Sequence, residues 1–349
     1  MRRLVEVLAA YKLRNKCSLD CLSLGDEGFV AERHGHPAIC DTFIGTKGSK
    51  VKFALKALKL ARKHRLSLVV IGHVGLAPIG WGLKRLGLIR SYVIIVYGVE
   101  VWRTLPWYDR CAVRNAKYIV SITEFTGREF CRHNGFPFAH IKVIPPVLVE
   151  DDISQPLRKA LGGGILRVLT VGRLSISDRD KGFDVLIRAV REARDGIANI
   201  QLLIVGDGED VDRLRRLVSS HDLDAEVTFL GAIGDERLRQ LYEECDLFVM
   251  PSKKEGFGIV FIEAMRYGKP CIGGKHGGTP EVITDGVDGY LVDYGDVKQL
   301  ARYLVELSKR SDLRLSMGMK GYEKVKSRFL FPHMRDHWFA LLDKLSGGL

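Results

Sequence analysis

Long apolar runs are absent from the sequence. The longest ones, such as Leu66 to Gly72 and Tyr92 to Val96, are the length of strands and fall far short of the roughly 18 residues that a membrane span requires. Met1 to Val7 also lacks the uncharged apolar core and the small-residue cleavage site of a signal peptide. We therefore expect neither a membrane-spanning segment nor export, and a cytoplasmic location.

Cysteines at metal-binding or redox spacing are absent too. The seven cysteines are scattered, and no C-x2-C pair marks a zinc or redox site. Reduced thiols, as in a cytoplasmic protein, are the expectation.

Acidic residues are scarce in the first 150 positions. This segment holds 24 Lys and Arg against 11 Asp and Glu, whereas the rest of the chain holds 30 against 31. A positive field of this kind attracts nucleic acid, an anionic membrane surface or a phosphorylated substrate. The interleaved aromatic and basic residues of a known nucleic-acid-binding module are missing, so we expect no nucleic-acid partner.

The length of 349 residues favours two domains, and the 46% hydrophobic content is typical of a globular chain. Two adjacent prolines favour extended backbone and place the domain boundary near Pro145. Beyond it, apolar strand-sized segments alternate with helical ones, which predicts a parallel sheet covered by helices on both faces. The expected strands are Arg167 to Val171, Ile200 to Val205, Val227 to Leu230 and Leu247 to Met250, and the expected helices are Gly182 to Arg194, Val211 to Ser220 and Asp235 to Glu244.

Before the boundary the same alternation is less regular. Arg2 to Tyr11 has the pattern of a helix at the point where a parallel α/β domain normally begins with a strand, so the first strand of such a domain is missing from the pattern. The strands that we expect are Leu19 to Leu24, Leu66 to Ile71, Tyr92 to Val96, Tyr118 to Ser121 and Lys142 to Ile144. Two domains of this type enclose a cleft that faces the carboxyl ends of both sheets, where we expect the function.

Two loops of the second domain carry the residues that indicate chemistry. Arg173 and Lys181 flank a strand-to-helix loop, and two cations beside a helix N-terminus can clamp a phosphate. In a second loop, Gly256 and Gly258 let the backbone approach a ligand between Glu255 and Glu263. Each feature by itself also occurs as ordinary surface charge at a turn.

The features occur together with further motifs in a fixed order. The motifs are Val171-Gly-Arg-Leu174, Lys181-Gly-Phe-Asp184, Val205-Gly-Asp-Gly208, Glu255-Gly-Phe-Gly258 and Gly277-Gly-Thr-Pro-Glu-Val-Ile283. From about Arg167 to Val292 the chain resembles the retaining nucleotide-sugar glycosyltransferases of family 4. The resemblance implies an α/β fold of the GT-B type, with two Rossmann-like domains whose parallel sheets face a central cleft. The domains would span residues 1–146 and 147–328, and residues 329–349 would form a helix that packs back towards the N-terminal domain.

The resemblance also implies roles for individual residues. Arg173 and Lys181 would hold the donor's diphosphate, Glu263 would accept hydrogen bonds from the ribose hydroxyls, and Glu255 would hold hydroxyls of the transferred sugar. The remaining donor-binding positions are Gly172, Gly206, Gly208, Phe257, Gly258 and Ile259. No metal ion or other cofactor is implied, and Asp178 and Asp180, which resemble a metal-holding acidic pair, lie beside the phosphate-binding cations.

The N-terminal half gives weaker signals. His73 follows an expected strand where family members often carry a histidine near the acceptor, so we include it among the catalytic candidates beside the alternative of a structural histidine. Tyr97 stands where many family members have a histidine before a glycine. Residues 46–65 carry eight cations interleaved with apolar side chains, a pattern that fits either an anionic membrane surface, at the inner face of the membrane, or a helix packed on the sheet with solvated lysines.

The function that the resemblance implies is retaining transfer of a hexose from a nucleoside-diphosphate sugar to a glycan or lipid-linked acceptor, in polysaccharide or glycoconjugate biosynthesis. Two alternatives stay open. One is a nucleotide-sugar epimerase of the same architecture, and the other is an inactive sugar-nucleotide-binding subunit.

Overall fold

The computed structural model of the protein describes residues 2–25, 40–64, 66–148 and 164–346. The chain divides into an N-terminal unit, Met1–Val149 with Phe331–Leu349, and a C-terminal unit, Glu150–Leu330. The sequence placed the domain boundary a few residues earlier, near Pro145, and the division itself falls outside the described residues. The last helix of the chain belongs to the N-terminal unit.

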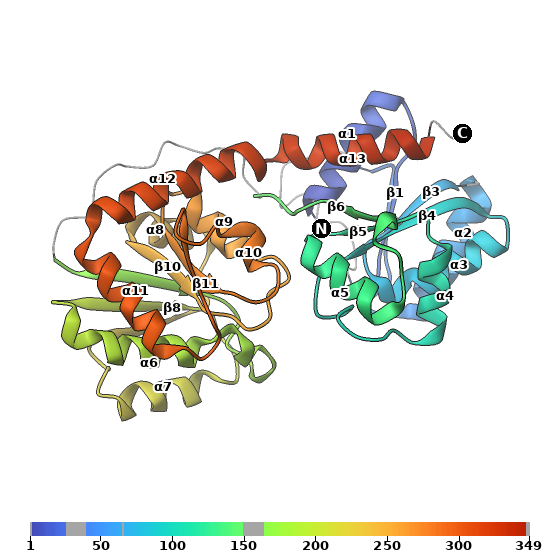
Figure 1. Ribbon diagram of the computed structural model, residues 1–349. Helices are drawn as coiled ribbons and strands as arrows, with labels where there is room; N and C mark the ends of the chain where they lie inside the picture. Colours follow the sequence, from blue (N-terminus) through green and yellow to red (C-terminus); the bar gives the residue numbers. More distant parts are fainter. Residues whose placement is uncertain (1, 26–39, 65, 149–163, 347–349) are drawn as a thin grey trace. The chain divides into compact units, whose positions relative to one another are not determined.

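The C-terminal unit is built on a parallel sheet. Its described strands are β7 (Leu166–Val171), β8 (Ile200–Val205), β9 (Val227–Gly231), β10 (Leu247–Met250), β11 (Cys271–Gly274) and β12 (Gly289–Val292), in the spatial order β12-β11-β10-β7-β8-β9. Its described helices are η4 (Ile176–Lys181), α6 (Phe183–Ala193), η5 (Arg194–Gly196), α7 (Val211–Ser220), α8 (Asp235–Glu244), α9 (Ile259–Met265), α10 (Thr279–Val282), α11 (Val297–Lys309) and α12 (Ser311–Arg328). Figure 1 labels most of these elements.

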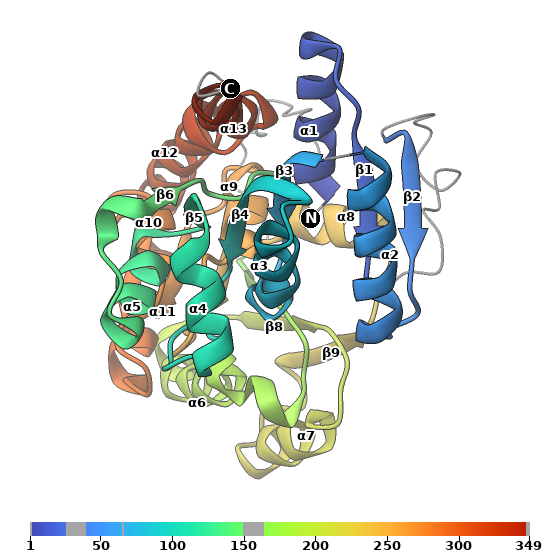
Figure 2. The ribbon, with the colours of Figure 1, turned by 90° about the vertical axis from the view of Figure 1, so that its right-hand side faces the viewer.

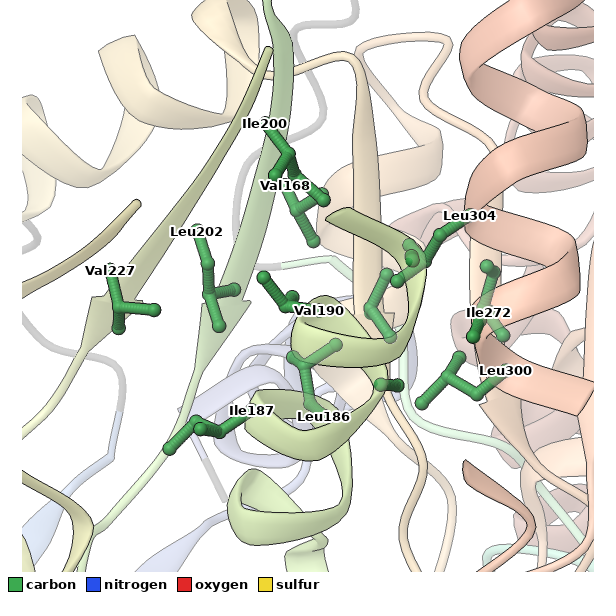
Figure 3. Packing of buried hydrophobic residues seen from close by; sticks show 14 of the residues in the cluster. Val168, Leu186, Ile187, Val190, Ile200, Leu202, Val227, Ile272, Leu300 and Leu304 are labelled. Carbon is green, nitrogen blue, oxygen red and sulfur yellow. The ribbon is translucent and has the colours of Figure 1, made fainter. Parts of the chain in front are cut away.

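The strands of this sheet are apolar on both faces because helices cover both. On one face, Leu186 and Val190 of α6 pack with Val168 and Leu202 of the strands and with Leu304 of α11 (Figure 3). On the other face, an aromatic cluster joins the sheet to α8 and α9. In this cluster, the Phe248 ring contacts Tyr242 at 5.9 Å and Phe261 at 5.6 Å between ring centroids. Burial on two faces explains the continuous apolar strands in the sequence.

The N-terminal unit contains, among its described residues, a four-stranded parallel sheet in the order β3-β4-β5-β6 and a separate parallel pair β1-β2. The strands are β1 (Asp20–Ser23), β2 (Thr42–Gly45), β3 (Leu66–Ile71), β4 (Ile89–Val96), β5 (Tyr118–Ser121) and β6 (Ile141–Val143). The helices are α1 (Arg2–Asn15), α2 (Lys50–His64), η2 (Val74–Leu76), α3 (Ala77–Arg85), α4 (Trp107–Asn115), α5 (Glu124–Asn134), η3 (Phe138–His140) and α13 (Phe331–Ser346). Figure 2 shows α2 beside the β1-β2 pair.

The two ends of the chain meet in the N-terminal unit. Helix α13 crosses and packs against α1 (Figure 1), and its Trp338, which is 1% exposed, lies in one apolar cluster with Leu4 and Val7 of α1 and Val93 of β4. At the end of α1, Tyr11 donates a hydrogen bond to Asp343 and contacts Phe339 edge to face. The first and last helices of the chain therefore contribute to the same apolar core.

The sequence located most elements but missed three strands. The expected strands and helices are all present within a few residues of their expected ends. β2 was missed because it has only two apolar side chains, Phe43 and Ile44, and ends in glycine, so it carries little apolar signal. β11 and β12 likewise contain glycines. No helix in the described part of the chain is long and apolar enough to span a bilayer.

Candidate functional site

The candidate site lies at the carboxyl edge of the C-terminal sheet, where its winding reverses. The chain moves outward from β7 to β8 and β9, then returns to the opposite side of β7 with β10. Ligands of such sheets bind at this reversal, outside the carboxyl ends of the strands. The loop after β7, residues 172–182, therefore lies beside the loop after β10, residues 251–258. These are the two loops that the sequence singled out.

Backbone contacts join the two loops directly. The Lys253 N–H donates to the carbonyl of Asp180 at 2.7 Å. Gly182 has φ +79°, and a Cβ there would lie 2.6 Å from the carbonyl oxygen of Pro251. Only glycine combines this left-handed conformation with such a close approach.

A second close approach sits beside the first loop. A Cβ at Gly206 would lie 1.8 Å from the carbonyl oxygen of Gly172, and a Cβ at Gly208 would lie 2.5 Å from that of Leu174. The turn after β8 therefore packs backbone against backbone on the loop after β7. The donor-binding prediction for Gly172, Gly206 and Gly208 is untested, but the structure shows a packing reason for glycine at positions 206 and 208.

The structure pairs each predicted phosphate-binding cation with a carboxylate. Lys181 Nζ lies 3.7 Å from Glu255 Oε2, and both side chains are about four-fifths buried, with exposed fractions of 22% and 19%. Arg173 Nη2 lies 3.2 Å from Asp178, and its side chain is 80% exposed. Lys181 and Glu255 are thus brought together from two loops, whereas Arg173 extends into solvent.

Glu263, on α9, contacts a residue that the sequence did not single out. The Tyr242 hydroxyl donates a hydrogen bond to Glu263 Oε2 at 3.0 Å, and Tyr242 is 3% exposed. Burial raises the pKa of the Glu263 carboxyl above its ordinary value, although the Tyr242 hydrogen bond and Arg266 act in the opposite direction. Burial also raises the pKa of Tyr242, which keeps the phenol protonated and able to donate. Tyr242 precedes Glu263 by 21 residues on another helix, so no local sequence signal links them.

The segment before α9 offers backbone donors. The amides of Phe257, Gly258 and Ile259 donate to no group among the residues that the structure describes, as expected for the start of a helix. Phe257 is 4% exposed and packs edge to face on Phe329 at 5.6 Å, which fixes this segment.

The two aspartates that resembled a metal-holding pair are both engaged with cations. Asp178 contacts Arg173 and accepts from the Ser175 hydroxyl at 2.7 Å, and Asp180 contacts Lys254 Nζ at 2.8 Å. In the described ranges, no group of three or more His, Cys, Asp and Glu side chains is arranged to hold a metal ion.

The N-terminal unit holds His73, which follows β3. Its Nδ1 accepts a hydrogen bond from the Gly75 N–H at 3.0 Å and so caps η2, while the side chain remains exposed. This contact supports a structural role and leaves Nε2 for another partner. Tyr97, after β4, is mostly buried, and burial raises its pKa to about 12.

The basic segment 46–65 forms helix α2 over Lys50–His64, and residue 65 lies outside the described part of the chain. Phe53 and Ala61 are buried against the unit, so one stripe packs inward as the alternative interpretation required. Val51 and Leu55 are 71% and 61% exposed, and they lie one turn apart on the outer side, near the exposed lysines 52, 56 and 59. The outer face is therefore cationic with two apolar side chains.

Comparison with known sequences identifies similar proteins. The family described as "Glycosyl transferases group 1" matches residues 158–324. A GDP-mannose-dependent alpha-(1-6)-phosphatidylinositol monomannoside mannosyltransferase of Mycolicibacterium smegmatis is 31% identical over 287 residues, which cover 77% of this chain and 74% of that protein. A GDP-mannose-dependent monoacylated alpha-(1-6)-phosphatidylinositol monomannoside mannosyltransferase of Corynebacterium glutamicum is 35% identical over 266 residues, 70% of this chain and 68% of that one.

Solved structures share the fold across nearly the whole chain. Anabaena HepE, crystallised with UDP, aligns with a TM-score of 0.79 at 21% identity and covers 98% of this chain and 95% of its own. Sucrose-phosphate synthase from Thermosynechococcus elongatus aligns with a TM-score of 0.78 at 22% identity, over 100% of this chain and 93% of its own. The α/β fold with parallel sheets is thus the GT-B fold, as expected.

The raised pKa of Glu263 predicts a pH-dependent stability. Because the folded pKa lies above the value of about 4.3 for an unfolded glutamate, protonation favours the folded state. This contribution is fully present below about pH 4.3 and is lost as the pH rises through the folded pKa. Glu263→Gln stays neutral at every pH, so its free energy of unfolding should rise relative to the parent over this range. Urea unfolding from about pH 4 to 8 measures the difference.

The exposed Glu192→Gln on α6 is the control for this experiment and should show no such increase. If the difference in the free energy of unfolding between Glu263→Gln and the parent stays constant with pH, Glu263 titrates alike in the folded and unfolded chains.

Proposed function

Because the chain belongs to the group 1 glycosyltransferases, we propose that it transfers a hexose from a nucleoside-diphosphate sugar to a glycan or lipid-linked acceptor, with retention at the anomeric carbon and without a metal ion. One observation carries the proposal: Lys181 and Glu255 contact each other at the carboxyl edge of the C-terminal sheet, where the strand order reverses. That the chain is a glycosyltransferase follows from its family. The donor, the stereochemistry and the acceptor are the proposal.

A donor of this class fits the charges of the loops. When a sugar leaves a nucleoside diphosphate, negative charge grows on the departing phosphate, and fixed cations and amides lower the barrier if they contact that charge. Lys181, Arg173 and the amides of residues 257–259 supply such groups from adjacent loops. Two of the mannosyltransferase relatives depend on GDP-mannose by name, and HepE was crystallised with UDP, which supports a nucleotide donor.

The two glutamates would contact different parts of the donor. Glu263, held by Tyr242, would accept hydrogen bonds from the ribose hydroxyls as a carboxylate. Glu255 would hold hydroxyls of the transferred sugar at the point where it now contacts Lys181. Their spacing resembles that of retaining family 4 enzymes, and this resemblance is the support for retention.

On the acceptor side we propose two elements. His73, whose Nδ1 is engaged by Gly75, would offer Nε2 to the acceptor or the transferred sugar. Helix α2 would bring the protein to an anionic membrane surface, which suits a lipid-linked acceptor, because its outer face joins lysines with the exposed Val51 and Leu55. The protein would then be a peripheral protein at the cytoplasmic face of the membrane.

The direct test is incubation with a panel of nucleoside-diphosphate hexoses and membrane lipid extract in the presence of EDTA. We expect a new glycoside whose anomeric configuration, read by NMR, matches that of the donor. An epimerised free donor without a glycoside would instead support the epimerase. Donors that bind in a thermal-shift assay but yield neither a glycoside nor an epimerised donor would support the inactive sugar-nucleotide-binding subunit. Activity that EDTA abolishes and Mn²⁺ or Mg²⁺ restores would bring Asp178 and Asp180 back as metal ligands.

The phosphate clamp predicts large effects of single substitutions. A charge-assisted hydrogen bond contributes roughly 1.5 to 3 kcal/mol, so Arg173→Ala and Lys181→Ala should each lower kcat about 10- to 150-fold. Arg194→Ala is the control, because Arg194 lies at the far end of α6 and contacts Glu226. Full activity of either clamp variant at saturating donor, with normal folding, would remove that residue from the proposed site.

The outer face of α2 predicts binding to anionic vesicles. Each lysine near such a surface contributes about 1 kcal/mol, and salt screens the attraction. The protein should sediment with phosphatidylglycerol vesicles at low salt, and changing lysines 52, 56 and 59 together to Gln should reduce binding without altering donor affinity. The matched control changes the exposed lysines 298, 309 and 320 of the C-terminal unit to Gln. Equal binding of the two triple variants would show that α2 does not contact the membrane.

A further inference from the structure

A buried carboxylate in the C-terminal unit is held by two arginines. Asp210, which immediately precedes α7, is 3% exposed. Arg179 donates to its Oδ1 from Nε at 3.0 Å and from Nη2 at 2.7 Å. Arg213 donates from Nε to Oδ1 at 2.8 Å and from Nη2 to Oδ2 at 2.6 Å. Two-point contacts of this kind are among the stronger hydrogen bonds in proteins, and they hold both partners in one geometry.

The two arginines come from different parts of the fold. Arg213 lies three residues after Asp210, on α7 itself, so its contact is local. Arg179 lies 31 residues before Asp210, in η4 of the loop after β7. Of the two arginine contacts, only that of Arg179 therefore links the loop after β7 to the turn after β8.

Arg179 occupies the part of the loop that sets the direction of Lys181. Its carbonyl accepts a hydrogen bond from the Gly182 N–H at 3.0 Å, which closes the turn around Lys181. The adjacent Asp180 carbonyl accepts from the Lys253 N–H at 2.7 Å, on the neighbouring loop.

The start of the same loop is also held. The Asp210 N–H donates to the Leu174 carbonyl at 2.8 Å, so the turn after β8 contacts the loop through its backbone as well. The loop is thus fixed at both ends, and Arg179 provides the side-chain contact between Ile176–Lys181 and the buried Asp210.

We propose that Arg179 is a positioning residue for glycosyl transfer, which acts through Asp210 to hold the loop so that Lys181 meets the donor diphosphate without rearrangement. The inference rests on the proposed role of Lys181. Its physical basis is preorganisation: a cation fixed before the reaction stabilises the transition state more than one that must be ordered during it. A displacement of about 1 Å at a reacting group can cost on the order of 100-fold in rate.

The pair of arginines offers a matched comparison. Arg179→Ala and Arg213→Ala each remove one guanidinium from the same carboxylate, and each leaves the other in place to neutralise it. If the cluster only stabilises the fold, the two variants should have similar activity at a temperature well below unfolding. If Arg179 positions Lys181, Arg179→Ala should lower kcat about 10- to 100-fold, whereas Arg213→Ala should stay within about two-fold of the parent. Arg179→Lys keeps the positive charge but not the two-point hydrogen bonding of the guanidinium, so it should recover part of the kcat that Arg179→Ala loses.

A double-mutant cycle tests the route of the effect. Adding Arg179→Ala to Lys181→Ala should lower kcat little further, because the group that Arg179 positions is already gone. Multiplicative losses in the double variant, or equal kcat values for Arg179→Ala and Arg213→Ala, would overturn the proposal. A Lys181→Ala variant with full kcat would instead contradict the clamp itself, so the two failures are distinguishable.

Discussion

The hydrogen-bonded pairing of β7 with β10 is the constraint on which the C-terminal unit depends. Strand β7 occupies the centre of the sheet, and the chain winds away from it in one direction before it returns on the other side. The two loops at the carboxyl ends of this pair must therefore run side by side. A close approach follows at Gly182 against Pro251, where any side chain would collide with backbone. A charged side chain of one loop can then contact a charged side chain of the other.

The three cations of the loop after β7 are each balanced by a carboxylate, but to different degrees. Arg179 is bound through two nitrogens to the buried Asp210, and the pKa of that carboxyl lies below its ordinary value mainly because of Arg213 and then because of Arg179. Lys181 faces Glu255 at a longer distance, and Arg173 is largely in solvent. The cationic side chains thus range from firmly held to solvent-exposed. Such an arrangement suits a site whose frame is rigid while its ligand-binding cations exchange a carboxylate of the protein for a phosphate.

The N-terminal unit is organised differently. Its strands are covered by two separate apolar clusters, and one of them includes Trp338 from the end of the chain beside Leu4 and Val7 from its beginning. Helix α2 carries six Lys and Arg and no acidic residue; its inner stripe is buried and its outer face carries exposed lysines. One helix thus combines a packing role with an exposed cationic surface, and the two interpretations of segment 46–65 apply to its opposite sides.

The sequence by itself determined the order of the elements of the C-terminal unit from β7 to β10, the family, and the two loops of the candidate site, because apolar periodicity and the glycine and charge motifs are local signals. It did not indicate β2, β11 or β12, because each of these four-residue strands contains glycine, which interrupts the apolar pattern. Only the tertiary structure decided the partners: Tyr242 with Glu263, Lys181 with Glu255, and Asp210 with Arg179. These contacts join residues on different elements, and hydrogen bonds between side chains depend on which elements the fold brings together rather than on their separation along the chain.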